Sequence, residues 1–226
     1  MIRAVVINGS PRMEKGNTAL VQGAFIEGML EAGAGVELFY ASRLHIKPCN
    51  CGKMVCWYRT PGQCCIDDDM NLLYPALRAA QIVVFATPVY IPLPGDLANI
   101  INRLCPLLDP QLSMRGGRTR ALLREDTAIR TFALVCTNGW WEKANCATVV
   151  RIVRELAENS SVSFGGALLR PHANQMRRQG IMTPRGEAAL AAAHQAGVEL
   201  VRDGAMHRET LQAAGKALVP KKEWWS

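Results

Sequence analysis

The sequence predicts an α/β fold, in which a doubly wound sheet of five parallel strands is covered by helices on both faces. Short apolar runs alternate with longer segments of helical period, which is the pattern of strands joined by helices. The run IVVFA at 82–86 is apolar throughout, as expected of a central strand that is buried on both faces. With 226 residues and 49% hydrophobic content, the chain can bury one sizeable core.

The five predicted strands are the apolar runs at 4–7, 36–40, 82–86, 131–136 and 162–169. After the first run, Val21, Phe25 and Met29 recur at the spacing of one helix face, and Gly33 follows them as a helix end. Further apolar faces of helical period lie around 97–104 and 149–156. Each helix therefore connects two strands of the predicted sheet.

The last helix is expected to begin at Thr183 and Pro184, which suit an N-cap and a first helical position, and to run to about residue 204. We expect one domain over 1–204, with a cysteine-rich insertion at 46–70 and a C-terminal tail at 205–226 that has no clear element of its own.

Two shorter segments are assigned as connections. The aspartates at 67–69 stand where a helix should begin, where carboxylates complement the helix dipole, so capping is preferred over catalysis for them. The segment MRGGRTR at 114–120 is expected to be a polar loop, with docking of a nucleotide phosphate or a partner subunit as the alternative.

The charge balance indicates which kinds of ligand the protein could bind. The chain has 26 basic and 19 acidic residues, a net charge of +7 that favours anionic ligands but is not concentrated enough to indicate nucleic acid. The start MIRAVVINGSP lacks the pattern of a signal peptide, and no run approaches the roughly 20 apolar residues that span a bilayer. We therefore expect a cytoplasmic protein without a membrane segment.

The loop at 8–18 is the first candidate site, because ligands of such sheets bind at the carboxyl ends of the strands. A loop between a strand and a helix N-terminus offers backbone N–H groups to a phosphate. Ser10, Asn17 and Thr18 add neutral donors, and Arg12 adds a bidentate cationic one. The loop contains neither G-x-G-x-x-G nor GK[ST]. It suits a single phosphomonoester; the alternative is a polar turn with a helix cap.

Three motifs at predicted strand ends carry a family resemblance. NGSPRMEKGNT, TPVY and TNGWWEK occur in that order, and together they resemble the flavodoxin-like NADPH-dependent FMN reductase superfamily. Within it, the segment IKPCNCGKMVCWYRTPGQCCIDDDM is similar to the iron–sulfur flavoprotein family. The resemblance extends from about residue 1 to 175 and implies a flavodoxin-like fold.

The resemblance implies an FMN site built from all three loops. The phosphate would bind Ser10, Arg12, Asn17 and Thr18. The isoalloxazine ring would lie between two groups of residues, which are Pro88, Val89 and Tyr90 on one side and Thr137, Asn138 and Gly139 on the other. No catalytic side chain is expected, because the flavin carries the chemistry. Trp140 and Trp141 either wall the flavin or pack beneath the next helix.

The cysteine-rich insertion reads C-x-C-x4-C-x7-C-C, which departs from the spacing of the iron–sulfur flavoproteins. The favoured interpretation is a [4Fe–4S] cluster on Cys49, Cys51, Cys56 and Cys64, with Cys65 spare. Tetrahedral zinc and free or redox-active thiols are the alternatives. The three remaining cysteines are expected to be small buried hydrophobes: Cys105, Cys136 and Cys146.

The resemblance implies an FMN-dependent oxidoreductase or electron-transfer flavoprotein. It would exchange electrons with small-molecule or protein donors and acceptors, with NAD(P)H as a candidate donor, and form a homodimer or homotetramer. One alternative is an NAD(P)H-dependent FMN or quinone reductase without a cluster. The other is a non-catalytic electron carrier like a flavodoxin.

Overall fold

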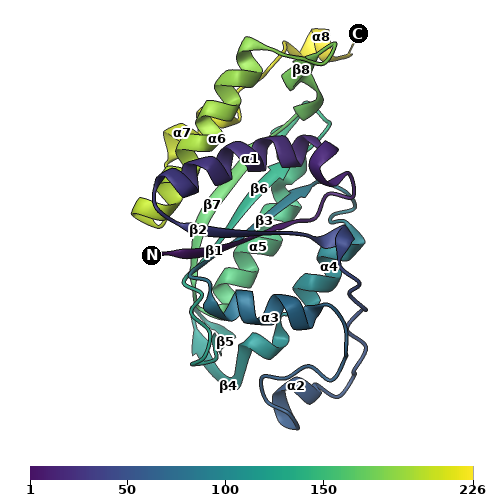
Figure 1. The fold of residues 1–226 in the computed structure, drawn as a ribbon, viewed down its shortest axis with the longest axis vertical. Helices are drawn as coiled ribbons and strands as arrows, with labels where there is room; N and C mark the ends of the chain where they lie inside the picture. The colour runs from purple at the N-terminus through teal and green to yellow at the C-terminus, as the bar shows by residue number, and fades with distance from the viewer. Residues whose placement is uncertain (226) are drawn as a thin grey trace.

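A five-stranded parallel sheet forms the centre of the computed structural model, which describes residues 1–225 (Figure 1). Its strands are β1 (Arg3–Asn8), β2 (Gly35–Tyr40), β3 (Ile82–Pro88), β6 (Thr131–Thr137) and β7 (Ser163–Arg170). They lie in the order β2-β1-β3-β6-β7. This is the flavodoxin-like order, in which the winding direction reverses between β1 and β3. The predicted fold class and all five predicted strands are confirmed.

Helices cover both faces of the sheet. One layer contains α1 (Asn17–Glu31) and α6 (Pro184–Asp203), and the other contains α3 (Met70–Ala79), α4 (Gly95–Asn102) and α5 (Ala147–Ser160). Because side chains of a strand alternate between faces, Val84 packs with the first layer, whereas Val83 and Phe85 pack with the second. Short 3-10 turns complete the connections: η1 (Met13–Lys15), η2 (Ala41–Arg43), η3 (Cys105–Leu107), η4 (Lys143–Cys146) and η5 (Ala173–Met176).

Helices α1 and α6 pack at backbone contact. A Cβ added at Gly28 would overlap the carbonyl oxygen of His194, and one at Gly197 would overlap that of Phe25. Only glycine fits at these two positions. Helix α6 therefore fixes the axis of α1, and with it the position of the loop at 8–18.

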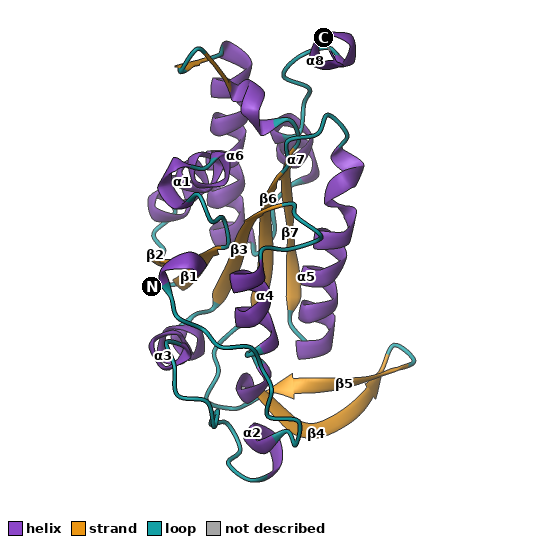
Figure 2. Ribbon diagram, turned by 90° about the vertical axis from the view of Figure 1, so that its right-hand side faces the viewer, coloured by secondary structure: helices purple, strands orange, loops and turns teal. Residues whose placement is uncertain are grey.

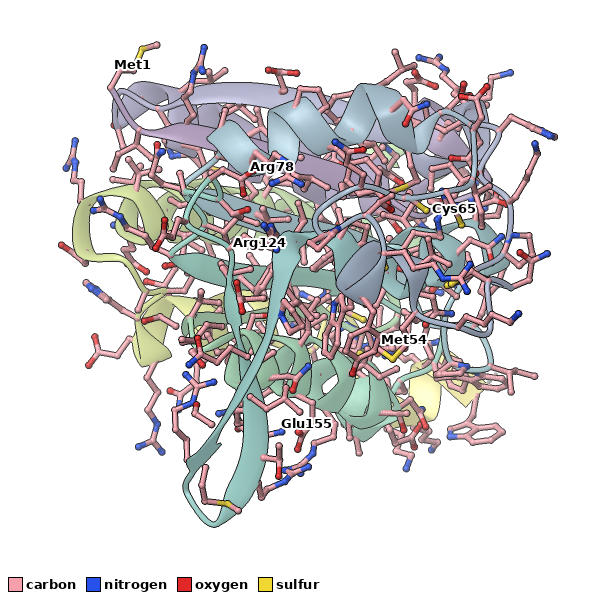
Figure 3. The ribbon with its side chains drawn as sticks, turned by 90° about the horizontal axis from the view of Figure 1, so that it is seen from below. Met1, Met54, Cys65, Arg78, Arg124 and Glu155 are labelled. Carbon is pink, nitrogen blue, oxygen red and sulfur yellow. The ribbon has the colours of Figure 1, made fainter. Side chains whose placement is uncertain are left out.

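A β-hairpin replaces the polar loop expected at 114–120, so that expectation was wrong. It pairs β4 (Leu108–Arg115) with β5 (Arg118–Leu123), and its turn consists of Gly116 and Gly117 with φ of +56° and +72°. Figure 3 shows the hairpin extending past α5, where Arg118 contacts Glu155 at 2.9 Å. The arginines predicted for a loop therefore lie on a paired ribbon beside α5.

The C-terminal tail contains two helices that the sequence pattern did not predict, α7 (Arg208–Ala214) and α8 (Lys221–Trp225). Two buried side chains hold it, Arg170 at the end of β7 and His172 just after it. Arg170 donates to the carbonyl oxygens of Ala214 and Lys216 at 2.7 and 2.6 Å, and Nε2 of His172 accepts from the N–H of Leu218 at 2.8 Å. The boundary at residue 204 stays a prediction.

The start of α6 agrees with the sequence: Thr183 is the N-cap, and its Oγ1 accepts from the N–H of Gly186 at 3.0 Å. A small ribbon of β8 (Arg177–Arg178) and β9 (Ile181–Met182) precedes it. Within residues 1–225, no helix has the length and apolar character needed to cross a bilayer.

Candidate functional site

The three loops predicted to bind FMN begin side by side at the carboxyl edge of the sheet, which faces the viewer in Figure 2. In the strand register, Asn8 pairs with Ala86, and Pro88 pairs with Thr137. Backbone bonds also join the loops, since Gly9 N–H donates to Ala86 at 2.8 Å and Val89 N–H donates to Thr137 at 2.9 Å. The fold therefore brings together segments that lie far apart in the sequence.

The first loop is held by its own polar groups. The Oδ1 of Asn8 accepts from the N–H of Ser10 at 2.7 Å, while its Nδ2 donates to Gln22 at 2.7 Å. Ser10 is buried, and its Oγ accepts from the N–H of Arg12 at 3.3 Å. Sequence reasoning missed Asn8 and Gln22, because a buried amide pair has no local sequence signal.

Helix α1 begins beside this loop without a side-chain cap. Gly16 occupies the N-cap position, and it offers no side-chain acceptor to the first turn. The first N–H groups of a helix lack partners within the helix and need an acceptor from outside. This arrangement favours an anion at the start of α1 over the alternative of a side-chain-capped turn.

Two predicted FMN residues meet in the interior. The Oγ1 atoms of Thr18 and Thr137 lie 2.7 Å apart and share a hydrogen bond. Both threonines are buried. The bond joins the first turn of α1 to the end of β6, and thus the predicted phosphate loop to the predicted ring loop.

The third loop contains an unsatisfied acceptor. The side chain of Asn138 is buried and its Nδ2 donates to the Cys146 Sγ at 3.1 Å, but its Oδ1 has no hydrogen-bond partner in the part of the chain that the structure describes. Beside it, a Cβ added at Gly139 would meet no atom within 4 Å. A buried amide oxygen without a partner is suited to accept from a ligand N–H.

The second predicted ring-binding loop is more open. Tyr90 is 49% exposed, and its N–H donates to the carbonyl oxygen of Pro92 at 2.9 Å. Pro88 and Val89 are half-buried at the end of β3. The structure thus places an aromatic side chain at the surface directly after the central strand.

The two tryptophans after Gly139 differ in their surroundings. Trp141 stacks on His172 with ring centroids 6.0 Å apart, and its Nε1 donates to Val219 at 3.1 Å. Trp140 is exposed, and its ring lies 6.2 Å from that of Trp224 on α8. Trp141 is therefore a packing residue of the tail.

The cysteine-rich segment, residues 46–70, lies at the opposite end of the molecule from α8 (Figures 1 and 2) and carries the short helix α2 (Val55–Tyr58). Arg103 of the α4 C-terminus holds both of its ends. It donates to Lys47 at 2.9 Å and Ile66 at 3.3 Å, and it forms a buried ion pair with Asp68. Sequence reasoning missed Arg103, because its partners are distant in the chain.

The aspartates at 67–69 precede α3, and two of them also bind the start of this segment and Arg103. Burial alone would raise the pKa of Asp68, but hydrogen bonds from Arg103 and from the N–H groups of Lys47 and Met70 lower it overall. Asp69 accepts from the N–H of His45 at 2.6 Å. The N-cap residue Asp69 makes no side-chain cap bond, so the simple capping expectation was incomplete.

The predicted cluster ligands are neighbours. Burial and the neighbouring thiol of Cys51 raise the pKa of Cys49, and the N–H of Val55 lowers the pKa of Cys51. Burial raises the pKa of Cys56, and this thiol interacts with those of Cys51 and Cys64. Yet across residues 1–225 no three Cys, His, Asp or Glu side chains are already placed to hold a metal ion. The donors are gathered, but they do not form an assembled site.

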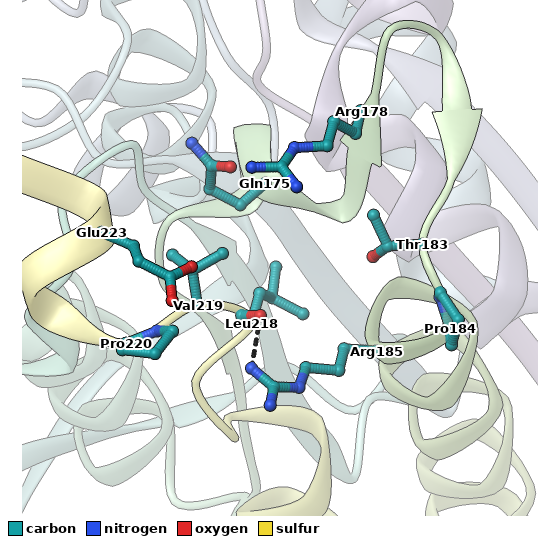
Figure 4. A pocket seen from close by; sticks show the side chains of 9 residues that line it. All are labelled: Gln175, Arg178, Thr183, Pro184, Arg185, Leu218, Val219, Pro220 and Glu223. Atoms are coloured by element: carbon teal, nitrogen blue, oxygen red, sulfur yellow. Dashed lines mark hydrogen bonds between the residues drawn. The ribbon is translucent and has the colours of Figure 1, made fainter. Parts of the chain in front are cut away.

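A cavity of about 440 Å³ lies elsewhere, between the tail and the start of α6 (Figure 4). Arg178, Arg185 and Gln175 contribute polar side chains to it, and Arg185 donates to Leu218 at 2.9 Å. None of the predicted FMN residues lines it. This cavity is therefore distinct from the three loops.

A family model for NADPH-dependent FMN reductases matches residues 2–123. The chain belongs to this family. The match includes the first two of the three loops, the cysteine-rich segment and the hairpin.

Individual relatives agree with membership of the NADPH-dependent FMN reductase family. An iron-sulfur flavoprotein from Methanosarcina thermophila is 35% identical over 99 residues, which are 43% of this chain and 49% of that protein. The chain spans about half the length of the curated relatives it matches.

Solved structures share the fold of this family member. An NAD(P)H:quinone oxidoreductase from Methanothermobacter marburgensis superposes with a TM-score of 0.60 at 18% identity, covering 88% of this chain and 96% of the other. A putative quinone reductase from Klebsiella pneumoniae gives 0.67 at 14% identity, with 89% and 86% covered. At these identities the likeness shows the fold.

Proposed function

We propose that this protein is an FMN-dependent oxidoreductase with an iron–sulfur cluster in its cysteine-rich segment. The observation that carries the FMN assignment is the unpartnered, buried Oδ1 of Asn138, at the edge where the three described loops meet. Membership of the NADPH-dependent FMN reductase family supports the same assignment.

The phosphate of FMN is assigned to the first loop. Ser10, Asn17 and Thr18 would supply neutral donors, and Arg12 would supply charge from its exposed side chain. The uncapped first turn of α1 supports this assignment, because its N–H groups and the helix dipole both favour an anion.

The isoalloxazine ring is assigned to the other two loops. The pyrimidine edge of a flavin carries a ring N–H, for which Asn138 Oδ1 is a suitable acceptor. Pro88, Val89 and Tyr90 would cover one side of the ring, and Thr137 and Gly139 would approach it from the other. When bound, FMN supplies the capacity to accept and pass on electrons, while the protein binds, orients and tunes it.

The cluster is assigned to the thiols of the cysteine-rich segment. Cys49, Cys51 and Cys56 are three of its proposed ligands, and Cys64 is the fourth that sequence order suggests. Thiolates are the donors that iron–sulfur clusters require, and this segment brings several thiols together on a loop that has no strand register to preserve. A relative that bears the name iron-sulfur flavoprotein adds support.

A second candidate is an NAD(P)H-dependent reductase with FMN and no cluster. It is favoured by the shifted C-x-C spacing and by the lack, within residues 1–225, of three side chains assembled around a metal position. In this case the thiols of the segment would be structural or redox-active.

The test is anaerobic purification followed by quantification of flavin, iron and acid-labile sulfide per chain. One FMN with about four irons and four sulfides supports the first candidate. One FMN without iron supports the second, and a protein that binds no FMN overturns both.

Light scattering on the same sample tests the proposed homodimer or homotetramer. Reduction by NADH, NADPH or a ferredoxin identifies the donor class, and cytoplasmic fractionation tests the location that suits reduced thiols.

A further inference from the structure

The side-chain amide of Asn138 contacts a buried sulfur atom at the start of α5. We propose that Cys146 is a positioning residue for the flavin, because its Sγ holds this amide in the orientation that keeps Oδ1 available to the ring N–H. The inference rests on the FMN site proposed above. It gives Cys146 a role beyond that of a small buried hydrophobe.

The backbone of Asn138 is fixed on both sides. Its N–H donates to the carbonyl oxygen of Arg170 at 3.1 Å, and its own carbonyl oxygen accepts from the N–H of Ala173 at 3.0 Å. These two partners are the last residue of β7 and the first residue of η5. The side chain of Asn138, which is itself buried, therefore extends from a backbone that is held by both neighbouring elements.

Both hydrogens of the side-chain amide have an acceptor. The Nδ2 of Asn138 lies 3.1 Å from Sγ of Cys146 and 3.4 Å from the carbonyl oxygen of Glu142. A carbonyl oxygen can only accept a hydrogen bond, so the contact with Glu142 identifies the nitrogen side of the amide. Within residues 1–225, Oδ1 is then the one polar atom of Asn138 without a partner.

The position of the sulfur is set by the packing of α5. Cys146 is the last residue of η4 and the N-cap residue of α5, and its side chain is fully buried. It belongs to the same apolar cluster as Val149 and Val153 of that helix. A core helix therefore supplies the closer of the two acceptors that hold the Asn138 amide.

An acceptor and a space-filling group at this position make different predictions. A thiol sulfur accepts a hydrogen bond weakly, and the hydroxyl oxygen of a serine could accept in its place. Alanine offers no acceptor, so it would leave one hydrogen of a buried amide without a partner, which is unfavourable. Asn138 would then be free to change its orientation, and Oδ1 would no longer be held for the ligand.

The test compares the dissociation constants of FMN and 3-methyl-FMN, in which a methyl group replaces the hydrogen of the ring N–H. Wild-type protein should prefer FMN by about 10-fold or more, because the methyl group removes the donor and leaves Oδ1 unpaired. Cys146→Ala should lose most of this preference, whereas Cys146→Ser should retain it. Val149→Ala is the matched control and should also retain it, because Val149 is buried on the same helix and its side chain forms no hydrogen bond.

The outcomes distinguish this inference from the site on which it rests. A wild type that binds no FMN overturns the FMN site. A wild type that binds both flavins equally overturns the assignment of Asn138 to the ring N–H. The inference falls in both cases. Where the wild type does prefer FMN, the positioning role alone is overturned by an unchanged preference in Cys146→Ala, or by an equal loss in Cys146→Ser or Val149→Ala.

A measurement on the wild type covers the case in which Cys146→Ala does not fold. Protein with ¹⁵N-labelled asparagine is studied by NMR before and after FMN is added. The side-chain amide hydrogens of Asn138 should show nuclear Overhauser effects to the β-hydrogens of Cys146 in both states, because the amide is oriented before the flavin binds. Absence of these effects in either state overturns the inference.

Discussion

The guanidinium of Arg103 and the carboxylate of Asp68 form a bidentate ion pair with N–O distances of 2.7 and 3.1 Å, and both side chains are fully buried. The same guanidinium donates to the carbonyl oxygens of Lys47 and Ile66, near the two ends of the cysteine-rich segment. One side chain of α4 therefore closes the loop that carries the proposed ligands. A buried pair of this kind is costly to break on one side only, because the remaining charge is left without a partner.

Replacing Asp68 with Asn should therefore lower the free energy of unfolding by about 3–5 kcal/mol, since it leaves the Arg103 charge buried and unpaired. Urea denaturation measures the change. Asp67→Asn is the control, because Asp67 is exposed and its carboxylate accepts from the side chain of Asn71 at the surface. Equal losses in the two variants would contradict the role given to the ion pair.

Removing the Arg12 side chain should weaken the binding of FMN without weakening that of riboflavin, which lacks the phosphate. A charge-assisted hydrogen bond contributes about 1.5–3 kcal/mol, so Arg12→Ala should raise the Kd for FMN by roughly 10- to 150-fold. Isothermal titration of the apoprotein with both flavins checks this. Arg3→Ala, at the opposite end of β1, should change neither Kd. A similar loss for riboflavin would place Arg12 away from the phosphate.

The hydrogen bond between Thr18 and Thr137 should be detectable as an energetic coupling. Thr18→Val and Thr137→Val each remove one hydroxyl and leave the other buried, which costs about 1–3 kcal/mol. The double variant should lose less than the sum of the two single variants. Urea denaturation of all four proteins completes the cycle. Strict additivity would show that the two hydroxyls do not interact.

Alanine at Gly28 should destabilise the protein, because its Cβ would meet backbone atoms of α6 that cannot move aside. Overpacking typically costs about 1–3 kcal/mol, and here the two helices would have to separate. Gly23 lies on the same helix, where an added Cβ would point into open space, so Gly23→Ala should instead stabilise by about 0.5–1 kcal/mol. Thermal unfolding should therefore shift in opposite directions for the two variants.

Acidification should loosen the tail through His172. Burial, with the charge of Arg170 as a second cause, lowers the pKa of His172 to about 4. The unfolded chain, with a histidine pKa near 6.5, then binds more protons between about pH 6.5 and 4, so stability is complete above this range and falls as the pH drops through it. Protonation would also remove the acceptor that Nε2 offers to Leu218.

The measurement is the free energy of unfolding at about pH 7 and pH 5. Wild-type protein should lose about 2 kcal/mol more over this interval than His172→Gln. His45→Gln provides the control, since His45 is exposed. If His172→Gln and the wild type lose the same amount, another group governs the acid response.

The central strands β1, β3 and β6 could be predicted because each contains an unbroken apolar run, and the start of α6 because Thr183 and Pro184 are local signals. The hairpin was missed because its strands are polar and half-exposed, so they do not alternate clearly. Gly116 and Gly117 were the available signal, since two glycines between extended segments favour a hairpin turn.

The site was predictable to the extent that it lies in loops after strands. Ser10, Thr18, Asn138 and the other predicted FMN residues gather at one edge because parallel strands end there. Cys146 was interpreted as a small buried hydrophobe, because its contact with Asn138 depends on how α5 packs against β6. Contacts of that kind depend on tertiary packing and leave no spacing pattern in the chain.

Because Arg103 binds both ends of the cysteine-rich segment, the residues between those ends can be exchanged as a unit. The entry of the segment at Lys47 and its exit at Asp68 are fastened to the same guanidinium, so residues can be inserted, deleted or respaced between them without displacing a strand of the sheet. A change in the cysteine spacing should therefore leave the stability of the flavin-binding core unchanged. A segment transplanted from a relative with regular spacing should fold in this scaffold, provided that it keeps the aspartate that meets Arg103.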